Sequence, residues 1–229
     1  MNEETKIVLP HGGYKKLIVY RKSDMIYEGT VAFCRRFLPP HGDRTVDQMV
    51  QAARSCKQNI VEGSAASGTS KETELKLTNV ARASLEELME DYVDYLKSHK
   101  FGEWPRNDER ALYARTFARE HSDWEDWREL FETRPAETLA NLMLTVCNQT
   151  SYMLGRMIAR QEEDFKKFGG VRERMHAART AQRGEDFDKS VYSRLSVAKS
   201  EAELGRLVNE VFRKTEAAAR SIRRRNGWA

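Results

Sequence analysis

The sequence predicts an all-α protein: an antiparallel up-and-down four-helix bundle with a helical insertion and a helical C-terminal extension. The 229 residues are 32% charged and include only 5 prolines and 13 glycines, a composition typical of amphipathic helices with solvated outer faces. Apolar residues recur at three- and four-residue spacing in four long segments. Because the loops between these segments are mostly short, we expect antiparallel neighbours.

The first two predicted helices span about residues 14–38 and 45–63. The first helix has a wide apolar face. Pro39 and Pro40 end this helix, because proline cannot donate a backbone hydrogen bond. Thr45 is placed to cap the second helix. We expect Gly63 to end that helix in a left-handed conformation.

The third and fourth predicted helices flank a segment without bundle periodicity. Thr69 is placed to cap the third helix, which continues to about Lys100, and Pro135 suits the first turn of the fourth. The segment between them, residues 102–134, is acidic and holds three of the four tryptophans. They are Trp104, Trp124 and Trp127. We predict that this segment forms a helical insertion.

Gly169 and Gly170 separate the bundle from a tail of different charge. We assign residues 11–168 to the bundle with its insertion and residues 169–229 to a basic helical extension. Residues 163–229 hold 16 Lys and Arg against 10 Asp and Glu, whereas the remainder is slightly acidic. This asymmetry indicates an anionic partner or self-association between unlike surfaces.

Composition and spacing exclude several classes of protein. No apolar run approaches the ~18 residues that span a bilayer, and the N-terminus lacks the form of a signal peptide, so we expect a cytoplasmic protein without membrane contact. The three cysteines are far apart in apolar patterns and predict buried reduced thiols. No zinc-ligand spacing, phosphate-binding glycine loop or nucleophile elbow occurs, so we expect no metal, no cofactor and no enzyme activity.

The second and third helices carry two motifs that resemble a known family. Residues 59–63 read NIVEG and residues 84–88 read SLEEL. Together they are similar to the signature of the bacterial four-helix-bundle family whose founding members are encoded within intervening sequences of large-subunit ribosomal RNA genes, with Val61 replacing the usual alanine. Residues 11–37 and 148–175 resemble a longer subgroup described as carrying a four-helix-bundle suffix domain.

The resemblance implies an up-and-down bundle that assembles into a ring-like homopentamer. A related accessory protein of diversity-generating retroelements is a basic pentamer that binds nucleic acid and a reverse transcriptase. The resemblance therefore implies RNA or DNA, and a reverse transcriptase or another protein, as partners. Many other members of the family have no assigned function, so it constrains the fold more than the activity.

Two groups of basic residues are candidates for phosphate contacts. They are Lys15, Lys16, Arg21, Lys22, Arg35 and Arg36 near the N-terminus, and Arg220, Arg223, Arg224 and Arg225 near the C-terminus. Each contact with a phosphate would release counterions and make the affinity depend on salt. The alternative is a solvated outer face for the first group and a simple charged helix end for the second, and the sequence leaves both interpretations open.

The signature residues and the tryptophans each have two interpretations. The signature residues are Asn59, Glu62, Gly63, Ser84 and Glu87. Asn59 and Glu62 share one helical face and form a candidate ligand site, but satisfying buried polar groups between helices or subunits is the favoured role. The tryptophans are candidates for stacking on bases, yet their acidic setting repels a polyanion. Core packing or a protein interface is favoured for them.

Two functions follow from these observations. The first is a non-enzymatic, homo-oligomeric nucleic-acid-binding or nucleoprotein-assembly module, with a role accessory to a reverse transcriptase or mobile-element enzyme as one option. The alternative is a structural adaptor that docks a protein partner through the acidic, tryptophan-bearing insertion.

Overall fold

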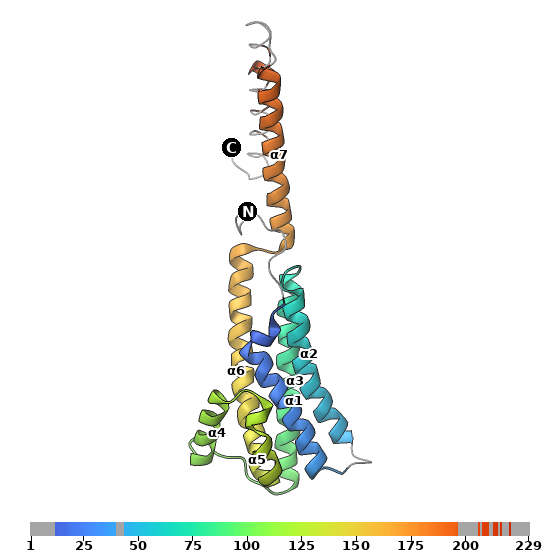
Figure 1. Cartoon of the computed structure of the whole chain (residues 1–229), viewed down its shortest axis with the longest axis vertical. Coiled ribbons are helices and arrows are strands. Elements are labelled where there is room, and N and C mark those ends of the chain that lie inside the picture. Colours follow the sequence, from blue (N-terminus) through green and yellow to red (C-terminus); the bar gives the residue numbers. More distant parts are fainter. Residues whose placement is uncertain are drawn as a thin grey trace. The chain divides into compact units, whose positions relative to one another are not determined.

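The computed structural model describes residues 12–39 and 44–196, together with a few positions between 206 and 220. Every element in this part of the chain is helical, and it contains no strand (Figure 1). The elements are η2 (Tyr14–Lys16), α1 (Ile18–Phe37), α2 (Arg44–Ala66), α3 (Lys71–Ser98), α4 (Glu109–Glu120), η3 (Trp124–Asp126), α5 (Arg128–Thr133), α6 (Ala136–Phe168) and α7 (Val171–Ser196). The predicted all-α class is confirmed. None of the described helices is both long enough and apolar enough to span a membrane.

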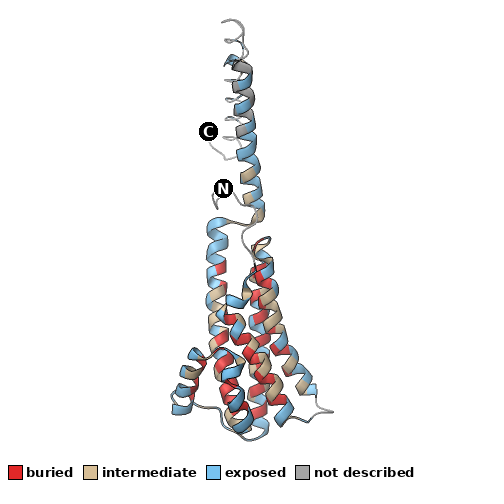
Figure 2. Cartoon of the chain, in the orientation of Figure 1, coloured by how far each residue is buried: buried red, intermediate tan, exposed pale blue. Residues whose placement is uncertain are grey.

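The chain divides into two compact units, Met1–Arg172 and Glu173–Ala229. Within the first unit, α2 packs against α3, α3 against α6, α6 against α1, and α1 against α2. The four helices therefore enclose one core, which contains Phe33, Leu85 and Leu154 as fully buried side chains. Figure 2 shows the buried residues gathered where these helices face one another.

Two predicted helix ends are wrong. The helix α2 continues through Gly63 to Ala66, and Gly63 does not adopt a positive φ. A side-chain Cβ at Gly63 would lie 3.5 Å from the Glu74 carbonyl oxygen, so this glycine lies in close contact with α3. At the start of α3 the cap is Ser70 rather than Thr69, because the Ser70 hydroxyl accepts the Thr73 N–H at 3.1 Å.

The N-terminal limits of two other helices also differ from the prediction. Residues 14–16 form a separate 3-10 turn, and α1 begins at Ile18. The helix α2 is described from Arg44, one residue before the predicted cap at Thr45. In the predicted extension, α7 continues to Ser196, and residues 197–229 lie almost entirely outside the described part of the chain.

The insertion packs into the core through its aromatic residues. Trp127 is fully buried, and the Phe117 ring meets it edge-on with the centroids 4.9 Å apart. Trp124 packs against Phe131, which is also buried, at 5.1 Å. Core packing is therefore the role of Trp127, and a base cannot stack on it. Trp104 is partly buried against the same core.

Gly29 allows the insertion to approach α1 closely. A Cβ at Gly29 would lie 2.9 Å from Phe131 Cζ and 3.1 Å from Met143 Sδ, both closer than atoms in normal contact. The position lies within α1 and has an ordinary helical backbone, so the requirement for glycine comes from space alone.

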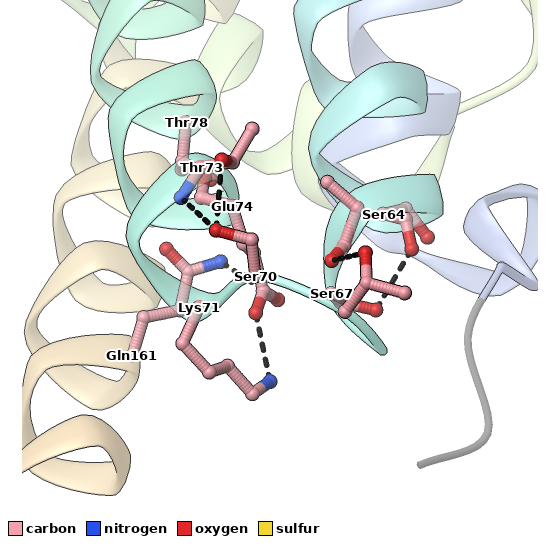
Figure 3. A network of polar contacts seen from close by, with 10 residues as sticks. Ser64, Ser67, Ser70, Lys71, Thr73, Glu74, Thr78 and Gln161 are labelled. Carbon is pink, nitrogen blue, oxygen red and sulfur yellow. Dashed lines mark hydrogen bonds and ion pairs between the residues drawn. The ribbon is translucent and has the colours of Figure 1, made fainter. Parts of the chain in front are cut away.

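A buried polar network joins the start of α3 to the distal part of α6 (Figure 3). The Glu74 carboxylate is buried and accepts hydrogen bonds from Lys71 Nζ at 2.7 Å and from Gln161 Nε2 at 3.2 Å. Thr78 Oγ1 donates to the Glu74 carbonyl at 2.9 Å. Because a buried carboxylate needs donors, Glu74 ties α6 to α3 beyond the apolar core.

We predict that Gly29→Ala destabilises the protein although alanine favours helices. Overpacking against Phe131 and Met143 costs about 1–3 kcal/mol, which outweighs a helix-propensity gain of up to about 1 kcal/mol. The matched control is Gly155→Ala in α6, where a Cβ would meet only the end of the Arg82 side chain at 3.7 Å. Urea unfolding should show a loss of stability for the first variant and no loss for the second. Equal stability of Gly29→Ala and the native chain would contradict the packing.

Candidate functional site

The predicted N-terminal basic residues divide into three that are exposed without a contact to the insertion and three that contact it, of which only Lys22 is buried. Lys15 and Lys16 are exposed on η2, and Arg35 is exposed near the end of α1. Arg21, Lys22 and Arg36 instead form contacts with the insertion, and these three residues do not belong to one open basic surface.

Arg21 and Arg36 each hold a different part of the insertion. Arg21 donates two hydrogen bonds to the Asp123 carboxylate, from Nε to Oδ1 at 3.0 Å and from Nη2 to Oδ2 at 2.6 Å. These bonds lower the pKa of Asp123. Arg36 Nη1 donates to the carbonyl oxygens of Phe131 and Arg134, both at 2.7 Å. The guanidinium of Arg36 thereby binds carbonyls at the end of α5, where a cation is favourable.

Lys22 is enclosed, so its assignment to an exposed phosphate-binding face is wrong. Its residue surface is 2% exposed, and Nζ donates to the Ala118 carbonyl of α4. Burial lowers the pKa of Lys22, and the positive charge of Arg21 lowers it further. No described carboxylate forms an ion pair with this ammonium.

The signature residues have mainly structural positions. Asn59 Nδ2 donates to the Ser55 carbonyl at 2.8 Å and lies 3.2 Å from Ser55 Oγ, which in turn bonds to Ser84 Oγ at 2.8 Å. This chain of hydrogen bonds links α2 to α3, as favoured for Asn59 by the sequence. Glu62 and Glu87 are exposed, so Glu62 does not satisfy a buried group between helices of one chain, and its expected role between subunits stays a prediction.

The second unit presents basic residues on one face of α7. His176, Arg179 and Arg183 are exposed and follow one another at spacings of three and four residues, which places them on one side of the helix. Farther along the chain, Arg220 is exposed and pairs with Glu216 at 3.2 Å. The predicted residues 223–225 lie outside the described part of the chain.

A groove of about 1020 Å³ lies in the first unit, bounded by α3, α4 and α6 with the start of α1 and residues 103–106. Its charged lining residues are Lys22, Glu90, Glu103, Arg106, Arg115 and Arg119. Trp104 and Tyr152 add aromatic rings, and the remaining lining is apolar or carries amide and hydroxyl groups. The groove can therefore hold a ligand that combines negative charge with an apolar or planar part.

Hydrogen bonds fix the walls of this groove. Gln149 Nε2 in α6 donates to the Arg115 carbonyl of α4 at 2.8 Å, and the Arg115 guanidinium donates to the Arg106 carbonyl. The backbone N–H of Trp104 donates to Asn141 Oδ1 at 2.8 Å. These contacts attach α4 and the segment before it to α6.

The overall charge of residues 102–134 does not single out the groove arginines. The insertion is acidic overall, and its net charge hides the basic side of α4. The signal available was the four-residue spacing of Arg115 and Arg119, which places both on one helical face.

The three cysteines are free and buried, which confirms the predicted buried thiols. They are Cys34, Cys56 and Cys147. Burial raises the pKa of Cys56 to about 12 and raises that of Cys147 as well. Thiols with raised pKa values are poor nucleophiles at neutral pH. Within the described residues, no group of three or more His, Cys, Asp or Glu side chains is arranged to hold a metal ion.

Comparison of the chain with protein-family models, with curated proteins and with solved structures finds no match. The family resemblance of the signature motifs therefore stays a prediction.

We predict that Arg36→Met destabilises the protein, because two carbonyl oxygens at the end of α5 would no longer have a charged donor. The expected decrease in stability is about 1 kcal/mol, since the site is partly exposed. Arg35→Met is the matched control and should change stability by less than about 0.5 kcal/mol. Chemical denaturation of both variants gives the comparison. An equal effect of the two substitutions would show that Arg36 does not hold the insertion.

Proposed function

We propose that the protein is a non-enzymatic, homo-oligomeric nucleic-acid-binding or nucleoprotein-assembly module. The observation that carries the proposal is the exposed basic face of α7. Arginines exposed along one face of a helix can neutralise phosphates of a nucleic-acid backbone without reading its sequence. A role accessory to a reverse transcriptase or other mobile-element enzyme remains part of this proposal through the family resemblance.

The composition of α7 supports phosphate binding. The first half of the helix, Val171–Arg183, contains four arginines and one carboxylate, Glu173, whereas the second half, to Ser196, holds three carboxylates and two cations. No described carboxylate forms an ion pair with Arg179 or Arg183, so their charges are available to a polyanion. Lys15, Lys16 and Arg35, exposed on the first unit, add further cations.

We also propose that α1, α2, α3 and α6 form an antiparallel up-and-down four-helix bundle that assembles into a homopentamer. The closed packing order of these helices supports the bundle. Exposed apolar side chains near the end of α6, Phe165 and Phe168, support a subunit contact, because a monomer gains nothing from exposing them.

A second candidate function is the protein-interaction adaptor. The buried Trp127 does not serve it, but α4 exposes Leu112 and Tyr113 as neighbours on the outside of the insertion. An exposed aromatic and aliphatic pair is a common anchor in protein interfaces.

The proposed function predicts salt-dependent binding that requires α7. We expect Arg179→Gln/Arg183→Gln to weaken binding of labelled RNA or DNA and to lower the slope of log affinity against log salt by about 0.7–0.9 for each phosphate that the variant no longer neutralises. Arg54→Gln/Lys76→Gln removes the same charge from exposed positions on α2 and α3 and serves as the control. Titration of single and double strands at two salt concentrations measures both quantities. Absence of binding at low salt would exclude the function.

The oligomer proposal predicts a particle heavier than one 26.5 kDa chain. Light scattering or native mass spectrometry at micromolar concentration measures it, and five times the chain mass is the expected result. A monomer under these conditions would refute the proposal.

A further inference from the structure

The groove of the first unit holds more positive than negative charge. Four of its lining residues are cations, and only Glu90 and Glu103 are carboxylates. Lys22 forms no ion pair with a described carboxylate, and the nearest acid to Arg119 is Glu120 at 3.9 Å, with both side chains mostly exposed. Lys22 donates only to a neutral carbonyl and Arg119 is mostly exposed, so an anion bound here would add a charged partner for both cations.

Arg115 and Arg119 are arranged to bind an oxyanion. They lie one turn apart on α4, so their guanidinium groups line the same side of the groove. The contact between Arg115 and the Arg106 carbonyl fixes this guanidinium in place while leaving other N–H donors of its fork available. The held guanidinium of Arg115 and the exposed one of Arg119 together suit a phosphate, which accepts paired hydrogen bonds from arginine.

Two aromatic rings accompany the arginines. Tyr152 lines the groove from α6 and is 68% exposed, so core packing does not account for it. The backbone of Trp104 is held by Asn141, and the Arg110 guanidinium lies 5.1 Å from the centroid of its ring. Aromatic rings beside cations are the usual platform for a stacked base.

Size and charge together restrict the ligand. About 1020 Å³ is at the upper end of the roughly 300–1,000 Å³ found for small-molecule sites, which is far more than a bare phosphate fills. Glu90 and Glu103 would repel a phosphate backbone that ran the whole length of the groove. The lining therefore suits one phosphate with an attached planar ring.

We propose that the groove binds a ligand with nucleotide chemistry, its phosphate on Arg115 and Arg119 and its planar ring on Tyr152. A free nucleotide and a single nucleotide unit of an unpaired strand share this chemistry. The site is separate from the basic face of α7, and it goes beyond the proposed function because it recognises a ring as well as charge.

The test measures binding of the four ribonucleoside monophosphates, inorganic phosphate and a short single-stranded oligonucleotide to the full chain by calorimetry. We expect a nucleotide, free or in the strand, to bind more tightly than inorganic phosphate. Arg119→Gln should weaken this binding about tenfold. Tyr152→Ala should weaken the binding of the nucleotide and leave the binding of inorganic phosphate unchanged.

Two matched controls accompany these variants. Tyr113→Ala removes an equally exposed tyrosine, 67% exposed on α4, that does not line the groove. Arg54→Gln/Lys76→Gln removes charge elsewhere on the first unit. Both controls should bind as the native chain does. Arg119 donates no hydrogen bond to a described backbone carbonyl, so Arg119→Gln tests the site without loosening α4, and circular dichroism checks that each variant is folded.

Each outcome decides the proposal. If free nucleotides bind and the groove variants weaken that binding, the groove is a site for free nucleotides. If the variants weaken only the binding of the oligonucleotide, the ligand is an unpaired strand. No binding of any probe, or binding that Arg119→Gln and Tyr152→Ala leave unchanged, overturns the inference. Displacement of the probes by an acidic peptide that binds more tightly also overturns it. Arg179→Gln/Arg183→Gln separates the two proposals. This change should weaken the binding of long nucleic acids and leave nucleotide binding in the groove unchanged.

Discussion

The contact of Phe131 and Met143 with Gly29 is the constraint on which the arrangement of the first unit depends. It brings the insertion directly onto α1, and with Trp127 it turns an added segment into part of the core. Since α4 and α5 follow one another in the same insertion, anchoring its end also limits where α4 can lie. The groove exists because α3 and α4 both pack against α6, and all three helices line it. Packing at one glycine thus influences a surface far along the chain.

The basic residues of α1 show how position decides the role of a charge. Arg21 and Arg36 bind a carboxylate and two carbonyls of the insertion, and Lys22 is enclosed against Ala118. Hydrogen bonds of this kind orient the insertion and occupy donors of Arg21 and Arg36, which stay exposed, whereas Lys22 is removed from the surface. A helix rich in Lys and Arg is therefore not by itself a nucleic-acid surface. On α7, Arg179 and Arg183 are exposed one turn apart on the same face, which leaves both open to a polyanion.

Periodicity predicted the long helices well, because each buries a continuous apolar stripe that can be read from its own residues. Phe33, Leu85 and Leu154 belong to such stripes and lie in the core. Gly63 was misjudged because glycine at a helix end and glycine at a close helix contact look alike in sequence. The groove could not be predicted, since its lining comes from α1, α3, α4 and α6 and depends on how the insertion folds back. The role of Arg36 has the same origin, because its acceptors are about a hundred residues away.

The charge of the insertion explains how an acidic segment can form the wall of a basic groove. The helix α4 packs against α6, and its buried residues are small: Ala111, Ala114 and Ala118. Once that stripe is fixed, helical geometry places Arg115 and Arg119 beside it, facing the groove. Glu125 and Asp126 lie on η3, directly after Asp123, whereas Glu109 and Glu120 lie at the two ends of α4. Net charge averages over all of these positions, whereas a ligand meets only one side of α4, so the local arrangement decides what binds.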